Sequence, residues 1–364
     1  ENHGWLDDYA LFSVLSDHFG SGSWDTWPET AKHRDRDTLS LYTKKFAEEL
    51  EREKFHQYIF FLQWHPLRKY CNDRKIRVIG DLPIYAGFDS ADVWAHQELF
   101  QLDKSCRPLV VAGVPPDYFS RTGQIWSNPL YRWDEHERTG FSWWTERFRH
   151  TFSLYDLVRI DHFRGLVAYY EIPPGATDAT GGRWVQAPAR SFFQTMMERF
   201  SVFPVIAEDL GVITPDVIEI MRTYCLPGMR VLQFAFTDET PSNPHAPHNL
   251  RNIMVFYTGT HDNAPTRAWF EHYATADDKR RLSHYLGREY TARELPDVFI
   301  RLAMMSVADT CIIPLQDLLA LGDNSRMNTP GTEVGNWEWR VTQDQLHEDT
   351  ATHLRHLTQV YGRL

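Results

Sequence analysis

Carboxylates stand at the ends of several short apolar stretches of this sequence. Three of them are the strongest candidates for chemistry, because each closes or closely follows a run that is typical of a buried strand: Asp161, Glu208 and Asp262. In a parallel barrel, catalytic side chains lie at the carboxyl ends of the strands. The sequence therefore predicts that these three side chains converge on one hollow, with the first two close enough to act on the same bond.

The surroundings of these carboxylates predict different roles. Arg159 lies two residues before Asp161, so both side chains share one face of a strand, and the guanidinium would keep Asp161 ionised as a nucleophile requires. Glu208 follows three apolar residues, so desolvation should raise its pKa toward the range of a general acid. Two carboxylates with opposite environments are the acid–base pattern of glycoside chemistry. Asp262, beside His261, could bind sugar hydroxyls and stabilise positive charge.

Other polar residues and motifs have competing explanations. An aspartate at a strand end can equally be a helix N-cap or part of a loop salt bridge, and this alternative stays open for Asp81 and Asp209. His162 is expected to be structural. The sequence contains no H-E-x-x-H, C-x-x-C, G-x-S-x-G, G-x-G-x-x-G or G-x-x-x-x-G-K-[ST] motif. Zinc, serine-hydrolase and nucleotide chemistry therefore lack support.

The elements that must position these residues alternate between strands and helices. Six short apolar runs, each followed by a loop, are predicted strands: 76–82, 157–161, 205–208, 229–236, 253–258 and 311–315. Helical patterns lie between several of them, and one begins at Thr214-Pro215-Asp216 with an N-cap, a proline and an acid in the first turn. This alternation predicts an α/β fold with parallel strands that are covered on both faces.

Six strands are two fewer than a closed (β/α)8 barrel of the TIM type requires. A barrel with a gap would expose unpaired strand edges, so we expect the N-terminal strands to be missing from this chain. Residues 1–364 are predicted to be a single, partial catalytic barrel domain. Residues 1–75 carry apolar side chains at spacings of three and four, which predicts a helical insertion.

Two long stretches, 86–144 and 173–188, are predicted to be irregular. The first contains Pro115-Pro116, several glycines and several tryptophans, and it is predicted to be a loop insertion that covers a substrate. Aromatic residues make up 14% of the chain, with 13 Trp, 16 Tyr and 22 Phe. Their flat apolar faces and polar edges suit a sugar ring, and a large aromatic core is the alternative.

Composition excludes several classes of partner. The 364 residues carry a formal net charge of −11, which argues against nucleic acid and against an anionic membrane surface. No apolar run reaches the roughly 18 residues of a transmembrane helix. The four cysteines are widely spaced and no signal peptide is visible, so we predict free thiols and a cytoplasmic location.

Several motifs of the sequence resemble those of the 4-α-glucanotransferases (amylomaltases, or disproportionating enzymes), family 77 of the glycoside hydrolases. The similar segments occur in the family's order over nearly the whole chain. They read WLDDYALF (5–12), IGDLPIY (79–85), GVPPDYFS (113–120), TGQIWSNP (122–129), RIDHFRG (159–165), AEDLG (207–211), TGTHDN (258–263), IPLQDLL (313–319) and NWEWR (336–340).

This resemblance implies an enzyme that transfers α-1,4-glucan segments between maltodextrins by a retaining double displacement. Asp161 matches the nucleophile, Glu208 the acid/base and Asp262 the transition-state stabiliser. The residues expected to bind the substrate are Arg159, His261, Asp81, Asp117, Gln124, Trp126 and Asn328. The implied partners are maltooligosaccharides and glucans derived from starch or glycogen, and the family needs no metal or cofactor.

The chain departs from the family pattern at two places. It starts past the family's first strands, and Ala264-Pro265 stands where the family usually carries polar residues. Three alternatives stay open: an α-amylase-type hydrolase on a similar barrel, which calcium dependence would favour; a non-catalytic glucan-binding fragment; and an isomerase or aldolase barrel. The last would need a lysine or a phosphate site after the final strands, where 316–328 contains no lysine.

Overall fold

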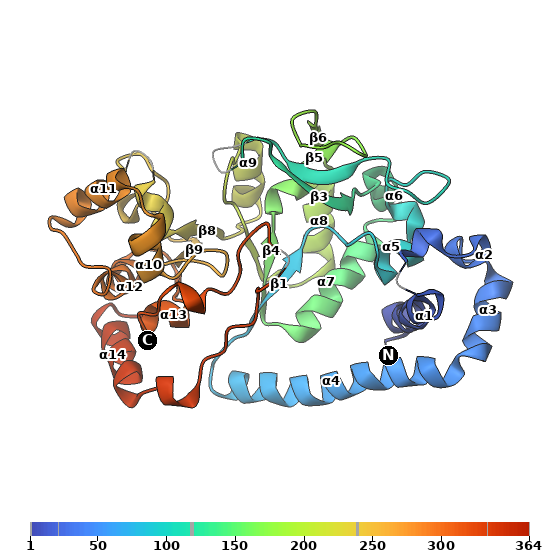
Figure 1. Ribbon diagram of the computed structural model, residues 1–364, viewed down its shortest axis with the longest axis horizontal. Coiled ribbons are helices and arrows are strands. Elements are labelled where there is room, and N and C mark those ends of the chain that lie inside the picture. The colour runs from blue at the N-terminus through green and yellow to red at the C-terminus, as the bar shows by residue number, and fades with distance from the viewer. Residues whose placement is uncertain (1, 21, 117–119, 238–239, 333, 364) are drawn as a thin grey trace. The chain divides into compact units, whose positions relative to one another are not determined.

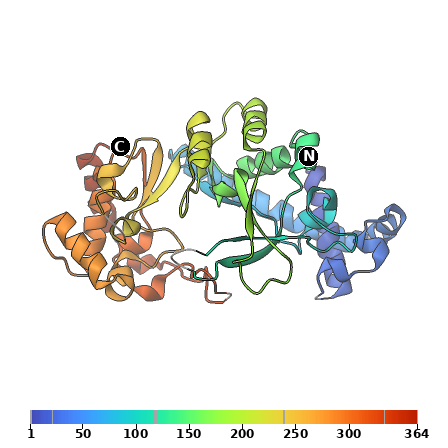
Figure 2. The same ribbon diagram turned by 90° about the horizontal axis from the view of Figure 1, so that it is seen from above.

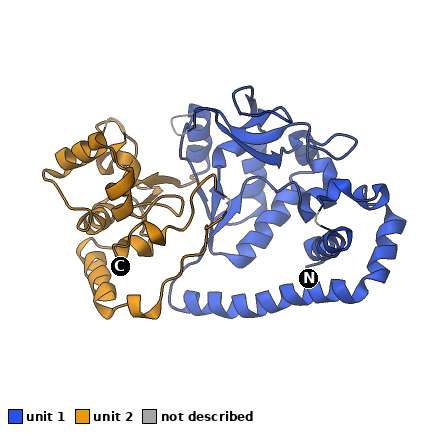
Figure 3. Ribbon diagram, in the orientation of Figure 1, with its two compact units in different colours: residues 1–224 blue, residues 225–364 orange. Residues whose placement is uncertain are grey.

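The backbone divides into two units, residues 1–224 and residues 225–364 (Figure 3). The computed structural model describes residues 2–20, 22–116, 120–237, 240–332 and 334–363. Each unit combines helices with a parallel sheet. Among the described helices, none is both long enough and apolar enough to cross a membrane.

The parallel sheet of unit 1 carries two of the predicted carboxylates at or just after its strand ends. Its strands, in spatial order, are β1 (Ile79–Pro83), β4 (Leu157–Asp161) and β7 (Val205–Ala207). Helix α7 (Ser142–Leu154) leads into β4, and α8 (Ala189–Arg199) leads into β7, as crossovers between parallel strands require. Figure 1 shows α7 alongside β1 and β4. After β7 the chain forms α9 (Pro215–Thr223), which begins where the N-cap pattern predicts.

Helices precede this sheet in the chain. They are α1 (His3–Phe19), α2 (Glu29–Lys32), α3 (Arg36–Lys45) and α4 (Ala47–Asp73). Figure 1 shows α4 as a long helix that runs along the rim of unit 1. Its Arg68 donates hydrogen bonds to the Asp156 carboxylate and to the backbone carbonyls of Ser153 and Tyr155. These bonds tie the C-terminal half of α4 to the residues that lead into β4.

A second sheet in unit 1 lies partly where we predicted irregular chain. This antiparallel sheet, drawn in teal and green in Figures 1 and 2, has the order β3 (Gln124–Pro129), β2 (Val111–Val114), β5 (Ala168–Ile172) and β6 (Arg183–Gln186). Segment 86–144 also contains α5 (Ala91–Ala95) and α6 (Trp133–Arg138). The prediction of irregular structure over 86–144 and 173–188 is therefore wrong for these elements. β2 obtains half of its pairing from β5, a strand far away in sequence, and no local pattern reveals such a partner.

The parallel sheet of unit 2 contains the last three predicted strands. In spatial order they are β10 (Thr310–Ile312), β9 (Met254–Tyr257) and β8 (Gly228–Val231). The helices of this unit are α10 (Thr266–Ala268), α11 (Ala276–Leu286), α12 (Leu295–Met305), α13 (Leu315–Leu318) and α14 (Glu348–Val360). A core that includes Phe236, Phe256 and Phe299 joins this sheet to its helices.

One predicted strand of unit 2 changes conformation halfway. The run 229–236 is extended only as far as Val231, and Leu232–Phe236 forms a 3-10 helix. Three of those five residues, Leu232, Ala235 and Phe236, are fully buried apolar residues, and Gln233 is buried with them. An unbroken apolar run is compatible with a buried strand and with a buried helical turn, so periodicity cannot separate the two.

All six predicted parallel strands are present, but they form two sheets of three strands, one in each unit. Within the described ranges, no pairing closes them into an eight-stranded barrel. The structure supports a mixed α/β fold with parallel sheets. The strand ends are the places where the candidate chemistry must be sought.

Candidate active site

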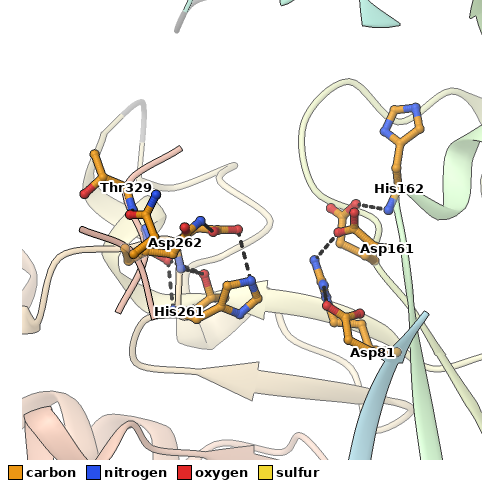
Figure 4. A network of polar contacts seen from close by, with 12 residues as sticks. Asp81, Asp161, His162, His261, Asp262 and Thr329 are labelled. Atoms are coloured by element: carbon orange, nitrogen blue, oxygen red, sulfur yellow. Dashed lines mark hydrogen bonds and ion pairs between the residues drawn. The ribbon is translucent and has the colours of Figure 1, made fainter. Parts of the chain in front are cut away.

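An arginine bridges two carboxylates on neighbouring strands of unit 1. Asp81 pairs with Arg159 in the register of β1 and β4, and Asp161 lies two residues further along β4, so the three side chains share one face of the sheet. Arg159 Nη1 donates to Asp81 Oδ2 at 2.7 Å, and Nη2 donates to Asp161 Oδ1 at 2.6 Å (Figure 4). Burial lowers the pKa of Arg159, but Asp161 and Asp81 outweigh this and raise it overall. A permanent cation therefore fixes the orientation of Asp161.

Glu208 lies next to this network, at the end of β7. Ile160 pairs with Ala207, and the Glu208 N–H extends the ladder to the carbonyl of Ile160, so Glu208 follows Asp161 onto the same face. Its carboxylate accepts the backbone N–H groups of His162 at 2.9 Å and of Leu210 at 2.8 Å. These two donors hold both oxygens in place.

The pKa of Glu208 is raised to about 7. Burial is the main cause, and the neighbouring Asp161 carboxylate adds to it. Arg159 and the two backbone N–H donors act in the opposite direction without cancelling the effect. At neutral pH both protonation states are populated, which is the property of a group that gives and takes a proton in one cycle.

His162 supports Glu208 through its backbone. Its φ is 49°, in the left-handed region that non-glycine residues seldom adopt, and this turn points its N–H at Glu208. The imidazole lies 4.8 Å from the Trp126 ring, edge to face, and burial lowers its pKa to about 4. The imidazole is therefore neutral near neutral pH. Sequence analysis missed this backbone contact, because a left-handed residue next to Asp161 leaves no signal in the sequence.

Strand β3 carries two of the predicted sugar contacts. Trp126 Nε1 donates to Gln124 Oε1 at 3.1 Å, and the Trp126 ring packs near His162 and Tyr85. The structure thus brings Gln124 and Trp126 close to the turn that follows Asp161. Asp117, the third contact predicted from this segment, lies outside the described residues.

A second polar cluster lies in unit 2, in the loop after β9 (Figure 4). Asn328 Nδ2 donates to Asp262 Oδ1 at 2.7 Å, and the Asn328 N–H donates to the His261 carbonyl at 3.1 Å. His261 Nε2 lies 3.4 Å from Asp262 Oδ2. The structure therefore joins His261, Asp262 and Asn328, three residues that the sequence places up to 67 positions apart.

Arg326 also belongs to this cluster, although sequence analysis did not single it out. Its Nη2 donates to the Asp262 carbonyl at 2.8 Å, and its Nε donates to the Asn328 carbonyl. The sequence around Arg326 does not predict this contact, because Asp262 lies 64 positions away in the chain. Among the described residues, no group of three or more His, Cys, Asp and Glu side chains is placed to hold a metal ion.

In unit 1, neighbouring parallel strands lead into an arginine-bound aspartate and a glutamate of raised pKa, an arrangement that suits an enzyme with paired acid–base carboxylates. The sequence model of the 4-alpha-glucanotransferases, glycoside hydrolase family 77, matches residues 1–346. The chain belongs to this family of enzymes.

Individual relatives agree with this assignment. A 4-alpha-glucanotransferase of Aquifex aeolicus (strain VF5) is 44% identical over 363 residues, which cover 100% of this chain and 74% of that protein. One of Thermus thermophilus is 47% identical over 368 residues, which cover 99% of this chain and 73% of that protein. The structure of amylomaltase from Streptococcus agalactiae in complex with acarbose superposes with a TM-score of 0.94 at 37% identity, covering 99% of this chain and 72% of that chain.

Proposed function

We propose that the protein moves α-1,4-glucan segments between maltodextrins by a retaining double displacement. The observation that carries this proposal is the pKa of about 7 at Glu208, beside an aspartate held by an arginine. In the first step Asp161 bonds to the anomeric carbon, and Glu208 gives its proton to the departing glycosidic oxygen. In the second step Glu208 takes the proton of an acceptor 4-hydroxyl, whose oxygen displaces Asp161.

The strand geometry supports this assignment of roles. Neighbouring strands lie about 4.8 Å apart, and retaining enzymes need their two carboxyl groups about 5–5.5 Å apart. Asp161 and Glu208 end adjacent strands and lie on one face. Arg159 occupies Asp161 Oδ1, and among the described residues no hydrogen-bond donor contacts Oδ2. We therefore assign the attack on the sugar to Oδ2.

Asp262 is proposed as the carboxylate that stabilises the positive charge on the sugar ring. Its Oδ1 is held by Asn328 and its Oδ2 faces His261, so its orientation is fixed before a sugar binds. We propose Arg159, Asp81, His261, Asn328, Gln124 and Trp126 as substrate contacts. Asp117 is added on the family resemblance alone.

We also propose the barrel fold and the glucan partners that the family resemblance implies. The six parallel strands would be part of a (β/α)8 barrel, and the substrates would be maltooligosaccharides and glucans derived from starch or glycogen. The structure of the Streptococcus agalactiae relative contains acarbose. None of the four cysteines forms a disulfide, which is compatible with the cytoplasmic location that we propose.

Incubation of the protein with maltotriose tests the proposal. Transfer should produce glucose together with longer oligosaccharides, with little net gain in reducing ends, because each cleaved bond is replaced by a new one. A gain of one reducing end per cleaved bond would instead indicate the α-amylase-type hydrolase. Binding of maltodextrin without any product would indicate a non-catalytic glucan-binding protein.

A further inference from the structure

The loop that carries His261 and Asp262 begins and ends at buried threonines. It consists of residues 258–265, which connect β9 to α10, together with Thr266, the first residue of α10. Thr258 and Thr266 are both fully buried, whereas Asp262 has a side chain that is 40% exposed. Asn328 and Arg326 hold Asp262 itself, and the contacts at the two ends of the loop determine where the loop stands.

Asp317 binds both ends of this loop. It lies in α13, directly after β10, and only 2% of its surface is exposed. Its Oδ2 accepts the hydroxyl of Thr258 at 2.6 Å and that of Thr266 at 2.8 Å, and its Oδ1 accepts the backbone N–H of Thr266 at 2.6 Å. One carboxylate thus closes the loop and also caps the first N–H of α10.

The burial of this carboxylate calls for an explanation. A buried carboxylate is costly unless it is paired or fully hydrogen-bonded, and no Lys, Arg or His of the described residues forms an ion pair with Asp317. Burial raises its pKa despite the three donors. All three donors belong to the two ends of the loop. The position of Asp317 is therefore accounted for by the loop that it closes.

We propose that Asp317 is a positioning residue, which clasps both ends of loop 258–266 and thereby holds Asp262 in its reactive orientation. This inference rests on the proposed role of Asp262. Contacts inside the loop complement the clasp: Asn263 Oδ1 accepts the N–H and the hydroxyl of Thr260. The contacts between Asn263 and Thr260 set the local conformation of the loop, and the hydrogen bonds to Asp317 hold the loop against α13.

The test compares the Asp317→Ala and Asp317→Asn variants of the protein. Hydrogen exchange of peptides over 257–268 reports on the loop, and kcat and KM with maltotriose report on the reaction. Asp317→Ala should speed exchange of the loop about tenfold or more and lower kcat about 10- to 100-fold, with KM changed less than about threefold, because a misplaced stabilising group affects the transition state most. Asp317→Asn should restore both to within about threefold, since its oxygen accepts the Thr266 N–H and its amide donates to both hydroxyls.

Asp278→Ala is the matched control. Asp278 is a buried carboxylate of the same unit that caps α11 through the Thr275 N–H and binds Arg281. Its loss should lower the melting temperature but leave loop exchange and kcat within about twofold of the parent. If Asp317→Ala fails to fold, Thr258→Val and Thr266→Val remove one hydroxyl each and should each lower kcat about three- to tenfold.

The outcomes separate this inference from the proposed function. An Asp317→Ala protein with kcat within twofold of the parent overturns the clasp, as does an equal loss of kcat in Asp278→Ala. Asp262→Asn is measured in parallel. If Asp262→Asn is inactive while Asp317→Ala is active, only the clasp fails. If Asp262→Asn keeps full activity, the role proposed for Asp262 fails, and the clasp fails with it as a device of the reaction.

Discussion

The pKa of Glu208 is set by neighbours that act in opposite directions. Burial and the Asp161 carboxylate raise its pKa to about 7, and Arg159 and two backbone N–H groups restrain the rise. A carboxyl group of this pKa is protonated below pH 7 and ionised above it. The first step of the proposed reaction needs the proton, so the sign of the pH dependence follows directly: activity must fall as the pH rises through about 7.

We predict that kcat/KM for maltotriose falls about tenfold for each pH unit above about 7. Glu208→Gln should lower the rate about 10²- to 10⁴-fold. Its residual activity should not fall at alkaline pH, because the amide does not ionise. Rates measured between about pH 5 and pH 9 check both statements. Glu219→Gln, which changes an exposed acid paired with Arg190, is the control and should keep the parent profile. An unchanged alkaline fall in Glu208→Gln would assign the titration to another group.

At the scale of the element, the approach of β2 to β3 positions Gln124 and Trp126. Gly113 of β2 pairs with Ile125 of β3. A Cβ at Gly113 would lie 2.1 Å from the Gln124 carbonyl oxygen and 2.5 Å from Ile172 Cδ1. The backbone oxygen cannot move away without breaking the pair, so a side chain at this position must separate the strands.

Gly113→Ala is therefore predicted to destabilise unit 1 by about 1–3 kcal/mol, the usual cost of overpacking. Transfer activity should fall as well, because β3 carries two proposed sugar contacts. Thermal unfolding and maltotriose assays measure the two effects. Gly87→Ala is the matched control, since a Cβ there meets nothing within 4 Å. Equal melting temperatures for the two variants would contradict the tight approach.

The individual strands show where sequence patterns are informative. The run 157–161 coincides with β4, and the runs 205–208 and 253–258 contain β7 and β9. β7 and β9 are buried along their whole length, so they read as unbroken apolar runs. β4 alternates instead: Val158 and Ile160 are buried on one face, and Arg159 and Asp161 lie on the other. Strands β2, β3 and β6 escaped prediction because their pairing depends on distant partners rather than on their own composition.

At the scale of the whole molecule, the balance between transfer and hydrolysis in the proposed reaction depends on how well water is kept from the proposed glycosyl–Asp161 intermediate. Trp126 presents a half-buried ring next to His162, whose backbone N–H binds Glu208, the proposed acid/base. We predict that Trp126→Ala increases the ratio of hydrolysis to transfer several-fold, since the ring both excludes water and offers a surface to the acceptor sugar.

The ratio of net reducing ends to new oligosaccharides, measured with maltotriose, checks this prediction. Trp184→Ala is the control: Trp184 lies on β6 of the same antiparallel sheet, and its ring stacks on Arg164. It should keep the parent ratio. If both variants change the ratio equally, the effect comes from a weakened sheet rather than from the Trp126 ring.

The sequence by itself determined the parallel strands, the carboxylates at or after their ends and the raised pKa of Glu208. These features depend on residues that are close together in the chain, such as the apolar residues before Glu208. The family could also be read from short motifs in chain order. Only the tertiary structure decided that His162 turns its backbone toward Glu208, that Arg326 and Asn328 hold Asp262, and that Asp317 closes the loop around it. These contacts join residues 46 to 66 positions apart or depend on a rare backbone angle, and neither property is encoded in a local pattern.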